Sequence, residues 1–372
     1  MSSVYDYIIV GAGISGLSSA YHLSKDGYRV LVLEENDGKE SASFASTAEM
    51  NHDPDADWDL IIAHFGIEGA QALWKLFGDT FDTLSEFAHQ IGESHFKTER
   101  VPAYLYTYTN GADTTVLKKK YALYEKIGAH VTLHTPSQPD LHPSFASVLT
   151  IHGDGVTNNQ HLISSLRHGI IEQGGQILNH QKVVSIQDSV VPTMDGTIYK
   201  GDTIIVATGD GKGLLPIATE IERKITFVVS LQREGIPDLF RNAVMWDTDE
   251  PYHYTRSFAG NRIWIGGEDV YEKEYYANSV IDEDKYQALI QYASDVLGID
   301  RSYTRQASWK GTFYPSKRGL PYVGEVEGTR MLASVGFGGS GLMTSFLSGY
   351  LIAAWERGEL LEYKQYFALH WS

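Results

Sequence analysis

The sequence predicts an α/β protein built on a Rossmann-like dinucleotide-binding domain, and three observations support this. The β-branched run Ile8 to Val10 ends in the motif Gly11-Ala-Gly13-Ile-Ser-Gly16. A second apolar run, Val30 to Leu33, follows a helical pattern and ends in Glu34. A strand-like run beginning at Met331 leads into the glycine-rich segment 336–341 and then into another helical pattern. Strand, glycine turn, helix and strand in this order form a βαβ unit.

Each glycine of the first motif has a physical reason. Gly11 allows the tight turn, Gly13 lets the backbone approach a pyrophosphate, and Gly16 lets the helix pack closely on the sheet. The helix N-terminus offers free N–H groups and a partial positive charge to phosphates. Glu34 lies 18 residues after Gly16, where a carboxylate accepts hydrogen bonds from ribose hydroxyls. The motif predicts a dinucleotide but does not by itself separate NAD from FAD.

Composition excludes several classes of function. The chain has 372 residues with 30 basic and 47 acidic side chains, a net charge of −17, which argues against nucleic acid or an anionic membrane surface as a partner. It has no cysteine, so disulfides, thiol catalysis, iron–sulfur ligation and a cysteinyl-flavin bond are excluded. The first residues lack a basic leader, and the apolar runs are too short for a membrane span. We therefore expect a cytoplasmic protein.

The remaining elements follow from periodicity. Helical spacing predicts helices over 70–91, 117–127, 158–172, 282–298 and 345–357. Strand patterns cover 104–109, 176–186 (including Val183 to Ile186) and 202–209, and antiparallel strands are expected at 226–231, 243–246, 252–257 and 262–266. Turns are expected at Asn110-Gly111 and at 259–261. The spacing of His130, His134 and His142 lacks a metal-binding register, so we expect no metal site.

Four segments, taken together, resemble the D-amino-acid oxidase / glycine oxidase / sarcosine oxidase (DAO) superfamily of FAD-dependent oxidoreductases. They are the motif 8–16 with Glu34; Val183-x-x-Ile186; Ile205-Val-Ala-Thr-Gly209; and Gly319-Leu-Pro-Tyr-Val-Gly324 with Gly336-Phe-Gly-Gly-Ser-Gly-Leu342. Their order and spacing span nearly the whole chain. The last segment is the most specific, and it favours FAD over NAD.

The resemblance implies a Rossmann-like FAD-binding domain (GR2-type) with an inserted α+β substrate domain built on an antiparallel sheet. The FAD-binding domain would comprise residues 1–50, 146–219 and 309–372. The substrate domain would comprise residues 51–145 and 220–308 and would cover the flavin.

The resemblance also implies non-covalent FAD and a set of cofactor-binding residues. Val183 would meet the adenine side through its backbone, and the segment 338–343 would direct N–H groups and a helix dipole at the flavin. Reduced flavin carries negative charge there, so an aimed dipole favours reduction. The complete set is Gly11, Gly13, Ile14, Ser15, Gly16, Glu34, Glu35, Ser43, Ala45, Ser46, Thr47, Ala48, Val183, Ala207, Thr208, Gly209, Phe337, Gly338, Gly339, Ser340, Gly341, Leu342 and Met343.

Similar enzymes remove a hydride from a carbon that bears an amine and pass it to flavin N5. A small-molecule amine or amino acid is therefore the expected substrate, and no acid–base triad is required when the amine binds neutral. The catalytic candidates are Tyr252, Tyr254, Met50, Trp309 and Lys310. The tyrosines with Trp264 and Trp309 are expected either to line an aromatic pocket or to form ordinary sheet core.

The chain departs from the family where the substrate carboxylate binds. Phe313 falls where similar amino-acid oxidases carry an arginine, and Met343 falls where sarcosine-oxidase-like members carry a lysine. The candidate replacement anchors are Arg256, Lys310, Lys317 and Arg318, and the residue type of each favours an ordinary solvated surface charge over an anchor.

Three alternatives stay open at this stage. The fold is also compatible with a flavin-binding protein without amine turnover, with an oxidoreductase acting on a hydroxy acid, and with an NAD(P)-linked dehydrogenase. The glycine-rich C-terminal segment argues against the last. The sequence does not predict the electron acceptor or the oligomeric state.

Overall fold

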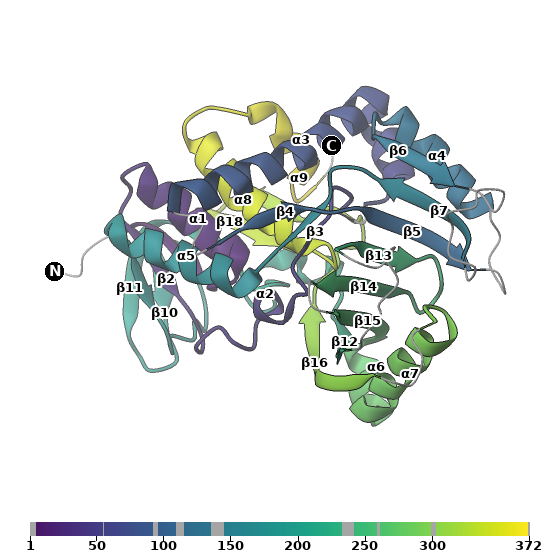
Figure 1. Cartoon of the computed structure of the whole chain (residues 1–372). Coiled ribbons are helices and arrows are strands. Elements are labelled where there is room, and N and C mark those ends of the chain that lie inside the picture. Colours follow the sequence, from purple (N-terminus) through teal and green to yellow (C-terminus); the bar gives the residue numbers. More distant parts are fainter. Residues whose placement is uncertain are drawn as a thin grey trace.

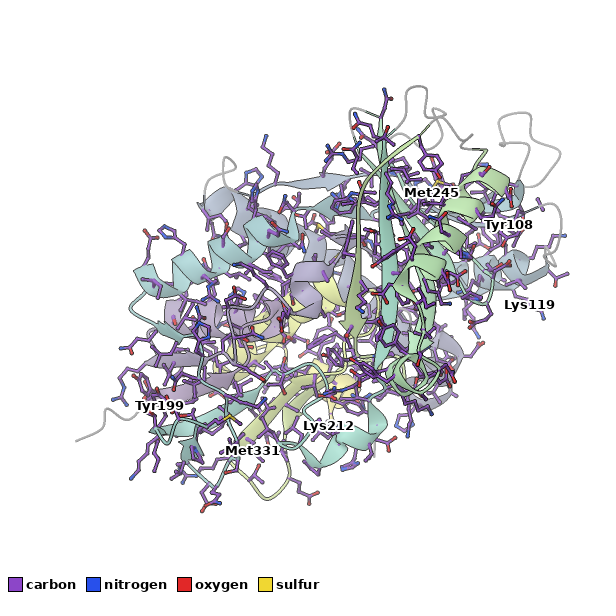
Figure 2. The ribbon with its side chains drawn as sticks, turned by 90° about the horizontal axis from the view of Figure 1, so that it is seen from below. Tyr108, Lys119, Tyr199, Lys212, Met245 and Met331 are labelled. Carbon is purple, nitrogen blue, oxygen red and sulfur yellow. The ribbon has the colours of Figure 1, made fainter. Side chains whose placement is uncertain are left out.

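Two large β-sheets organise the chain. The computed structural model describes residues 5–54, 56–91, 96–108, 115–134, 145–232, 242–258, 261–298 and 303–370. Figure 1 shows the two sheets in different halves of the molecule. In Figure 2, Tyr199 and Met331 of the first sheet lie towards one end, and Tyr108 and Met245 of the second lie towards the other.

The first sheet is mostly parallel. Its strand order is β17-β18-β11-β1-β2-β9, with β10 beside β11. The central pairs are parallel, so the carboxyl ends of β1, β2, β11 and β18 meet at one edge, where open α/β sheets bind ligands. The strands are β1 (Tyr5–Val10), β2 (Val30–Leu33), β9 (Gln176–Leu178), β10 (Val190–Pro192), β11 (Ile198–Val206), β17 (Tyr322–Glu325) and β18 (Met331–Val335).

Helices α1 (Ile14–Lys25), α5 (Asn159–Glu172) and α8 (Gly341–Glu356) pack with this sheet (Figure 1). The Ser18 hydroxyl of α1 donates to the Phe346 carbonyl of α8 at 2.6 Å. A Cβ atom at Gly349 would lie 2.2 Å from the Ser19 nitrogen, so only glycine permits this helix crossing. The N- and C-terminal parts of the chain are therefore joined through one close helix pair.

The second sheet has eight strands in the order β16-β12-β15-β14-β13-β5-β7-β6. Every neighbouring pair is antiparallel except β13 and β5, which are parallel. The strands are β5 (Ala103–Tyr108), β6 (Val131–His134), β7 (Phe145–Ile151), β12 (Lys224–Gln232), β13 (Val244–Asp247), β14 (His253–Phe258), β15 (Arg262–Tyr271) and β16 (Thr304–Phe313).

The remaining elements cover and connect the sheets. A small sheet has the order β3-β8-β4, formed by β3 (Glu49–Met50), β8 (Gly155–Thr157) and β4 (Thr98–Arg100). The long α3 (Trp58–Ile91) contains a non-helical residue, Gly66. The others are α2 (Ala42–Ala45), α4 (Thr115–Lys126), α6 (Glu272–Ala277), α7 (Asp282–Asp295), α9 (Lys364–Phe367) and the 3₁₀ turns η1 (Pro216–Glu220) and η3 (Leu361–Tyr363). Apolar residues of α7 pack against β12 and β15 in a core of their own.

Most of the expected elements are present. The N-terminal βαβ unit, the antiparallel strands between 224 and 271 and the helices α3, α4, α5, α7 and α8 are confirmed. The strand expected at Val183 to Ile186 is wrong, because this segment forms only an isolated bridge between Val183 and Thr193 and leaves Val184 exposed. The turn at Asn110-Gly111, residues 259 and 260 of the second turn, and His142 lie outside the described residues.

The division into an FAD-binding and a substrate domain stays a prediction. Sheet membership differs from the expected boundaries in two places. Strand β7 and the end of β16 belong to the eight-stranded sheet, whereas the expected FAD-binding domain includes residues 146–151 and 309–313.

Within the part of the chain that the structure describes, no helix has the length and apolar character needed to cross a membrane. The same described residues contain no group of three His, Asp or Glu side chains able to hold a metal ion.

Candidate active site

A cavity of about 1000 Å³ is lined by residues from both large sheets. The first sheet contributes the ends of β1, β2 and β11 and the turn before α8. The second sheet contributes residues of β12, β13, β14, β15 and β16, and the segment around α2 and β3 completes the wall. A cavity of this size holds a large cofactor together with a small substrate.

The turn between β1 and α1 accepts only glycine at two positions. Gly11 has a φ of +105°, and a Cβ atom there would lie 2.5 Å from the Ala207 carbonyl oxygen. A Cβ atom at Gly16 would lie 2.0 Å from the Gly11 carbonyl oxygen. The two glycines therefore bring the turn, the helix and the end of β11 together at the cavity.

Glu34 closes the same turn from the end of β2. Its Oε2 accepts a hydrogen bond of 2.7 Å from the Ala12 N–H, and its Oε1 accepts one of 3.2 Å from the Asn36 N–H. The residue lines the cavity. A carboxylate accepts several hydrogen bonds at once, so Glu34 retains capacity for ligand hydroxyls.

The start of α1 faces the cavity without a side-chain cap of its own. Gly13 is the N-cap residue, and the N–H of Ile14 donates to the Ser43 hydroxyl at 3.0 Å. This bond places the α2 segment across the positive end of the helix. The α2 segment and the start of α1 both line the cavity wall. An anionic group is favoured there because the helix N-terminus carries a partial positive charge.

The C-terminal glycine segment forms the opposite edge. The Gly336 N–H donates to Gly209 O at 2.9 Å, and the Gly338 N–H donates to Tyr314 O at 3.1 Å. The φ angle is +81° at Gly336 and +70° at Gly338. Helix α8 begins directly after this turn, and its first two residues, Gly341 and Leu342, line the cavity.

Most of the residues expected to bind the cofactor line this one cavity. They are Gly11, Gly13, Ile14, Ser15, Glu34, Glu35, Ser43, Ala45, Ser46, Thr47, Val183, Ala207, Thr208, Gly209, Phe337, Gly338, Gly339, Ser340, Gly341 and Leu342. Gly16, Ala48 and Met343 of the expected set do not line it. Gly16 is in the helix–strand contact, and Met343 is 2% exposed in the main hydrophobic core.

Among the catalytic candidates, Tyr252 and Tyr254 line the cavity, with ring centroids 6.0 Å apart. A Cβ atom at Gly266 would lie 2.4 Å from the Tyr254 hydroxyl oxygen, so glycine on β15 makes room for this phenol. Trp246 and Phe313 add aromatic surface to the same wall. This part of the cavity therefore carries aromatic surface, and it includes Phe313, the residue at which the resemblance leads us to expect an arginine.

The other three catalytic candidates do not line the cavity. Met50 is fully buried in the main core. The Trp309 indole N–H donates to Ala45 O at 2.9 Å, which fastens β16 to the α2 segment. The Lys310 ammonium forms an ion pair of 2.9 Å with Asp282 and donates to the Tyr275 hydroxyl at 2.6 Å.

Two of the possible carboxylate anchors bind backbone carbonyls instead. The Arg256 guanidinium donates to Thr47 O, to Ala48 O at 3.2 Å and to Thr157 O at 2.8 Å. Burial lowers the pKa of Arg256 to about 10, while Glu49 and Glu99 favour its charge. Arg318 likewise donates to four carbonyls, those of Leu320, Pro321, Phe367 and Ala368. Neither arginine lines the cavity.

The remaining anchor candidate is also placed elsewhere. The Lys317 ammonium lies 3.5 Å from Glu220 on the surface, and it does not line the cavity. All four cations proposed from the sequence thus have other partners and lie outside the cavity lining.

Sequence reasoning missed several lining residues, above all Asp269, Thr226 and Lys224. Strand alternation was the signal that would have found two of them. Lys224 and Thr226 are two residues apart on β12, so their side chains share one face of the sheet, on which the Thr226 hydroxyl lies 3.5 Å from the Tyr254 hydroxyl. Asp269 follows Gly267, which has a φ of +135° beside a shift in the pairing of β12 with β15, and sequence alternation does not predict its face.

Comparisons with known proteins agree with this architecture. A family model described as "FAD dependent oxidoreductase" (DAO) matches residues 6–355. Gamma-glutamylputrescine oxidoreductase of Escherichia coli (strain K12) is 24% identical over 95% of this chain and 84% of its own length. Glycine oxidase of Geobacillus kaustophilus (strain HTA426) is 22% identical over 95% of this chain and 93% of its own length.

Solved structures share the fold. The crystal structure of glycine oxidase from Geobacillus kaustophilus matches with a TM-score of 0.82 at 19% identity and covers 98% of both chains. The crystal structure of L-proline dehydrogenase from P. horikoshii matches with a TM-score of 0.77 at 16% identity, over 99% of this chain and 98% of the other.

The glycine turn, the carboxylate at the end of β2 and the second glycine turn before α8 fit a dinucleotide that lies along the first sheet's side of the cavity. With the family model matched over nearly the whole chain, the protein belongs to the DAO family of FAD-dependent oxidoreductases, and FAD is its cofactor.

Proposed function

We propose that the protein oxidises the C–N bond of an amine or amino acid, using non-covalently bound FAD as hydride acceptor. The observation that carries this proposal is the continuity of the cavity. It runs from the β1–α1 turn and Glu34 to the aromatic wall of Tyr252, Tyr254 and Phe313. A cofactor held at the first end therefore shares its cavity with a substrate held at the second.

The chain's own groups define how the cofactor is held. The turn at Gly11 to Gly16 and the start of α1 would take the pyrophosphate, and Glu34 would take the ribose hydroxyls. The residues before α8 would face the flavin ring, where the partial positive charge of the helix N-terminus favours negative charge. Bound FAD supplies the redox chemistry, because its oxidised ring accepts a hydride from a carbon bearing an amine.

The substrate side supplies orientation rather than proton transfer. Tyr252, Tyr254, Trp246 and Phe313 offer flat apolar surface that packs against the substrate and excludes water. Orientation of the reacting C–H bond accounts for a large part of the acceleration of such a reaction. An amine that binds in its neutral form needs no strong base, in agreement with a lining without a Ser-His-Asp arrangement among the described residues.

The test is anaerobic reduction of the FAD-loaded protein. Primary amines, secondary amines, D- and L-amino acids and hydroxy acids are added separately, and the flavin absorbance at about 450 nm is followed. Saturable bleaching by a compound with a C–N bond supports the proposal. Reduction only by hydroxy acids would support the alternative oxidoreductase.

A second candidate function is a flavin-binding protein without amine turnover. It is favoured by one observation, namely that Phe313 lines the cavity while Arg256, Lys310, Lys317 and Arg318 are engaged elsewhere. Tight FAD binding with no reduction by any member of the panel would favour this candidate over the first.

A further inference from the structure

Resting on the proposed amine oxidation, we propose that the substrate is a di- or polyamine whose second positive charge is held at an acid-lined wall of the cavity, with Asp269 as its counter-ion. The acid-lined wall is defined as the cavity-lining residues of β3, the segment before α3, α4 and β12 to β15. A di- or polyamine has no carboxylate, so its binding requires no arginine or lysine anchor.

The charge of the acid-lined wall is the first observation. Its carboxylates come from several separate segments and outnumber its ammonium groups. The acidic members are Glu49, Asp53, Asp247, Asp249, Glu250 and Asp269, and the basic members are Lys120 and Lys224. Arg223, just before β12, is bound to Asp210 and Glu272. A wall of this sign attracts a cation and repels the carboxylate of an ordinary amino acid.

Asp269 is the second, independent observation. It lines the cavity, both of its carboxylate oxygens are shielded from solvent, and neither has a hydrogen-bond partner of ordinary geometry. Buried carboxylates in proteins are as a rule paired or hydrogen-bonded. A cation arriving in the cavity would supply a charged partner, which the neutral hydroxyls of Thr226 and Tyr252 beside the carboxylate do not.

The neighbours of Asp269 are consistent with an ionised carboxylate that awaits a cation. Burial raises the pKa of Asp269 to about 6, while the Thr226 and Tyr252 hydroxyls and the Lys224 charge act in the opposite direction and Glu250 raises it further. The carboxyl is therefore ionised above that pH. Lys224 lies with its ammonium 5.0 Å from the ring centroid of Tyr271.

Three of the other acids of the wall are already bound to protein groups. Asp247 pairs with His253 at 2.9 Å, and Asp249 accepts a hydrogen bond from the Tyr108 hydroxyl. Asp53 accepts from the Trp58 indole at 3.2 Å and from the Tyr124 hydroxyl. These three acids are engaged with protein groups, whereas neither carboxylate oxygen of Asp269 has a hydrogen-bond partner of ordinary geometry.

A second charge is required by the chemistry proposed above. The amine that loses the hydride reacts in its neutral form, so it does not compensate a wall that stays ionised during the reaction. An ammonium group elsewhere in the same molecule does. Its distance from the reacting amine sets which chain length fits.

The experiment uses the FAD-loaded full-length protein under anaerobic conditions. Butylamine, putrescine, spermidine and γ-aminobutyrate carry the same aminomethyl group and differ in the far end, which is a methyl, an ammonium, an extended diamine or a carboxylate. We expect putrescine or spermidine to reduce the flavin with an apparent Kd at least tenfold below that of butylamine, and γ-aminobutyrate to bind most weakly. The apparent Kd of the diamine should rise as the pH falls through about 6.

Asp269→Asn isolates the counter-ion, and Glu283→Gln, which removes an exposed acid paired with Arg305 on α7, is the matched control. Asp269→Asn should raise the apparent Kd of the diamine at least tenfold, because the variant loses the carboxylate that pairs with the second ammonium. The apparent Kd of butylamine should stay within about twofold, since butylamine has no second ammonium to form this pair. The control should change neither value. Retained flavin absorbance shows that the variant is folded. The comparison of the four amines on the wild-type protein tests the inference even if the variant does not fold.

Two outcomes overturn the inference and leave the proposed function intact. One is a lower apparent Kd for γ-aminobutyrate or an α-amino acid than for either polyamine. The other is an equal loss of butylamine and diamine binding in Asp269→Asn, which indicates a structural role. A flavin that no amine or amino acid reduces contradicts the proposed function itself.

Discussion

The Glu34 carboxylate accepts a 2.7 Å hydrogen bond from the backbone N–H of Ala12, so the end of β2 holds the glycine turn in place before any ligand binds. The same side chain lines the cavity. One carboxylate therefore holds the glycine turn and faces the cavity, where we propose that it binds the ribose of FAD.

Replacing Glu34 by Ala should lower FAD affinity by about tenfold to a hundredfold, because hydrogen bonds to a charged group contribute about 1.5–3 kcal/mol. The measurement is FAD titration of the apoprotein, followed by quenching of flavin fluorescence. Asp37→Asn is the control, since Asp37 is nearby, half-exposed and paired with Lys39. Equal affinities of the Glu34 and Asp37 variants would contradict the role of Glu34.

Gly16→Ala should abolish the close packing of α1 on β1, because the new Cβ would lie 2.0 Å from the Gly11 carbonyl oxygen, which is backbone and cannot rotate away. We expect the free energy of unfolding to fall by about 1–3 kcal/mol or more, as in overpacked cores. We also expect the variant to lose FAD binding. Thermal unfolding and flavin retention measure it. Gly328→Asn, at a left-handed turn with open space, should unfold as the wild type does.

Arg256→Lys should destabilise the protein by about 1–3 kcal/mol, because a single ammonium cannot reach the carbonyls of Thr47, Ala48 and Thr157 together. Chemical unfolding measures this loss. The apparent Kd for substrate should change less than it does in Asp269→Asn. A selective loss of carboxylate-bearing ligands in the variant would instead restore Arg256 as a carboxylate anchor.

Stability should depend on pH through His253. Burial alone would lower the pKa of His253, but hydrogen bonds to Asp247 and Glu268 outweigh it and raise the pKa to about 9. The folded state therefore holds the proton more tightly than the unfolded chain, whose histidine titrates near about 6.5. The stabilisation is complete below about pH 6.5 and is lost as the pH rises through 9.

We expect the wild-type melting temperature to fall between about pH 7 and 10, with a stability loss on the order of 1–2 kcal/mol after allowance for solvent screening. His253→Gln should flatten this part of the pH profile. A variant whose melting temperature falls as steeply as that of the wild type would show that other groups control the transition.

Asp269→Asn should stabilise the ligand-free protein above pH 6. Burial raises the folded pKa of Asp269 above its ordinary value, so the folded state binds this proton more tightly and loses stability as the pH rises through about 6. Asparagine removes the cost of the buried charge, with an expected gain of roughly 1–3 kcal/mol at pH 8. A lower melting temperature of the variant at pH 8 would contradict it.

The cofactor end of the molecule was predictable because its determinants are local. Gly11, Gly16 and Glu34 belong to one short βαβ unit, in which turn chemistry and hydrophobic runs specify the geometry. The segment before α8 was predictable for the same reason. Val183 to Ile186 was not, because its apolar residues lie beside β10 without forming a continuous strand.

The part of the cavity around Tyr254 and Asp269 depends on contacts between distant segments. Arg256 is a candidate anchor by residue type, but its guanidinium binds carbonyls contributed by residues 47, 48 and 157, which no local pattern reveals. Asp269 faces the cavity beside a pairing shift that interrupts strand alternation. Lys310 is a candidate by residue type, but its ammonium pairs with Asp282, the first residue of α7, which lies 28 residues earlier in the chain.

The parallel pairing of β13 with β5 joins strands that lie more than a hundred residues apart in the chain. During synthesis, β5 and β7 leave the ribosome long before their partner β13 exists, and the edge of β5 stays open until residue 244 emerges. Long-range pairings of this kind form slowly and expose strand edges meanwhile. The eight-stranded sheet is therefore completed late, once residue 244 and the strands that follow it are available.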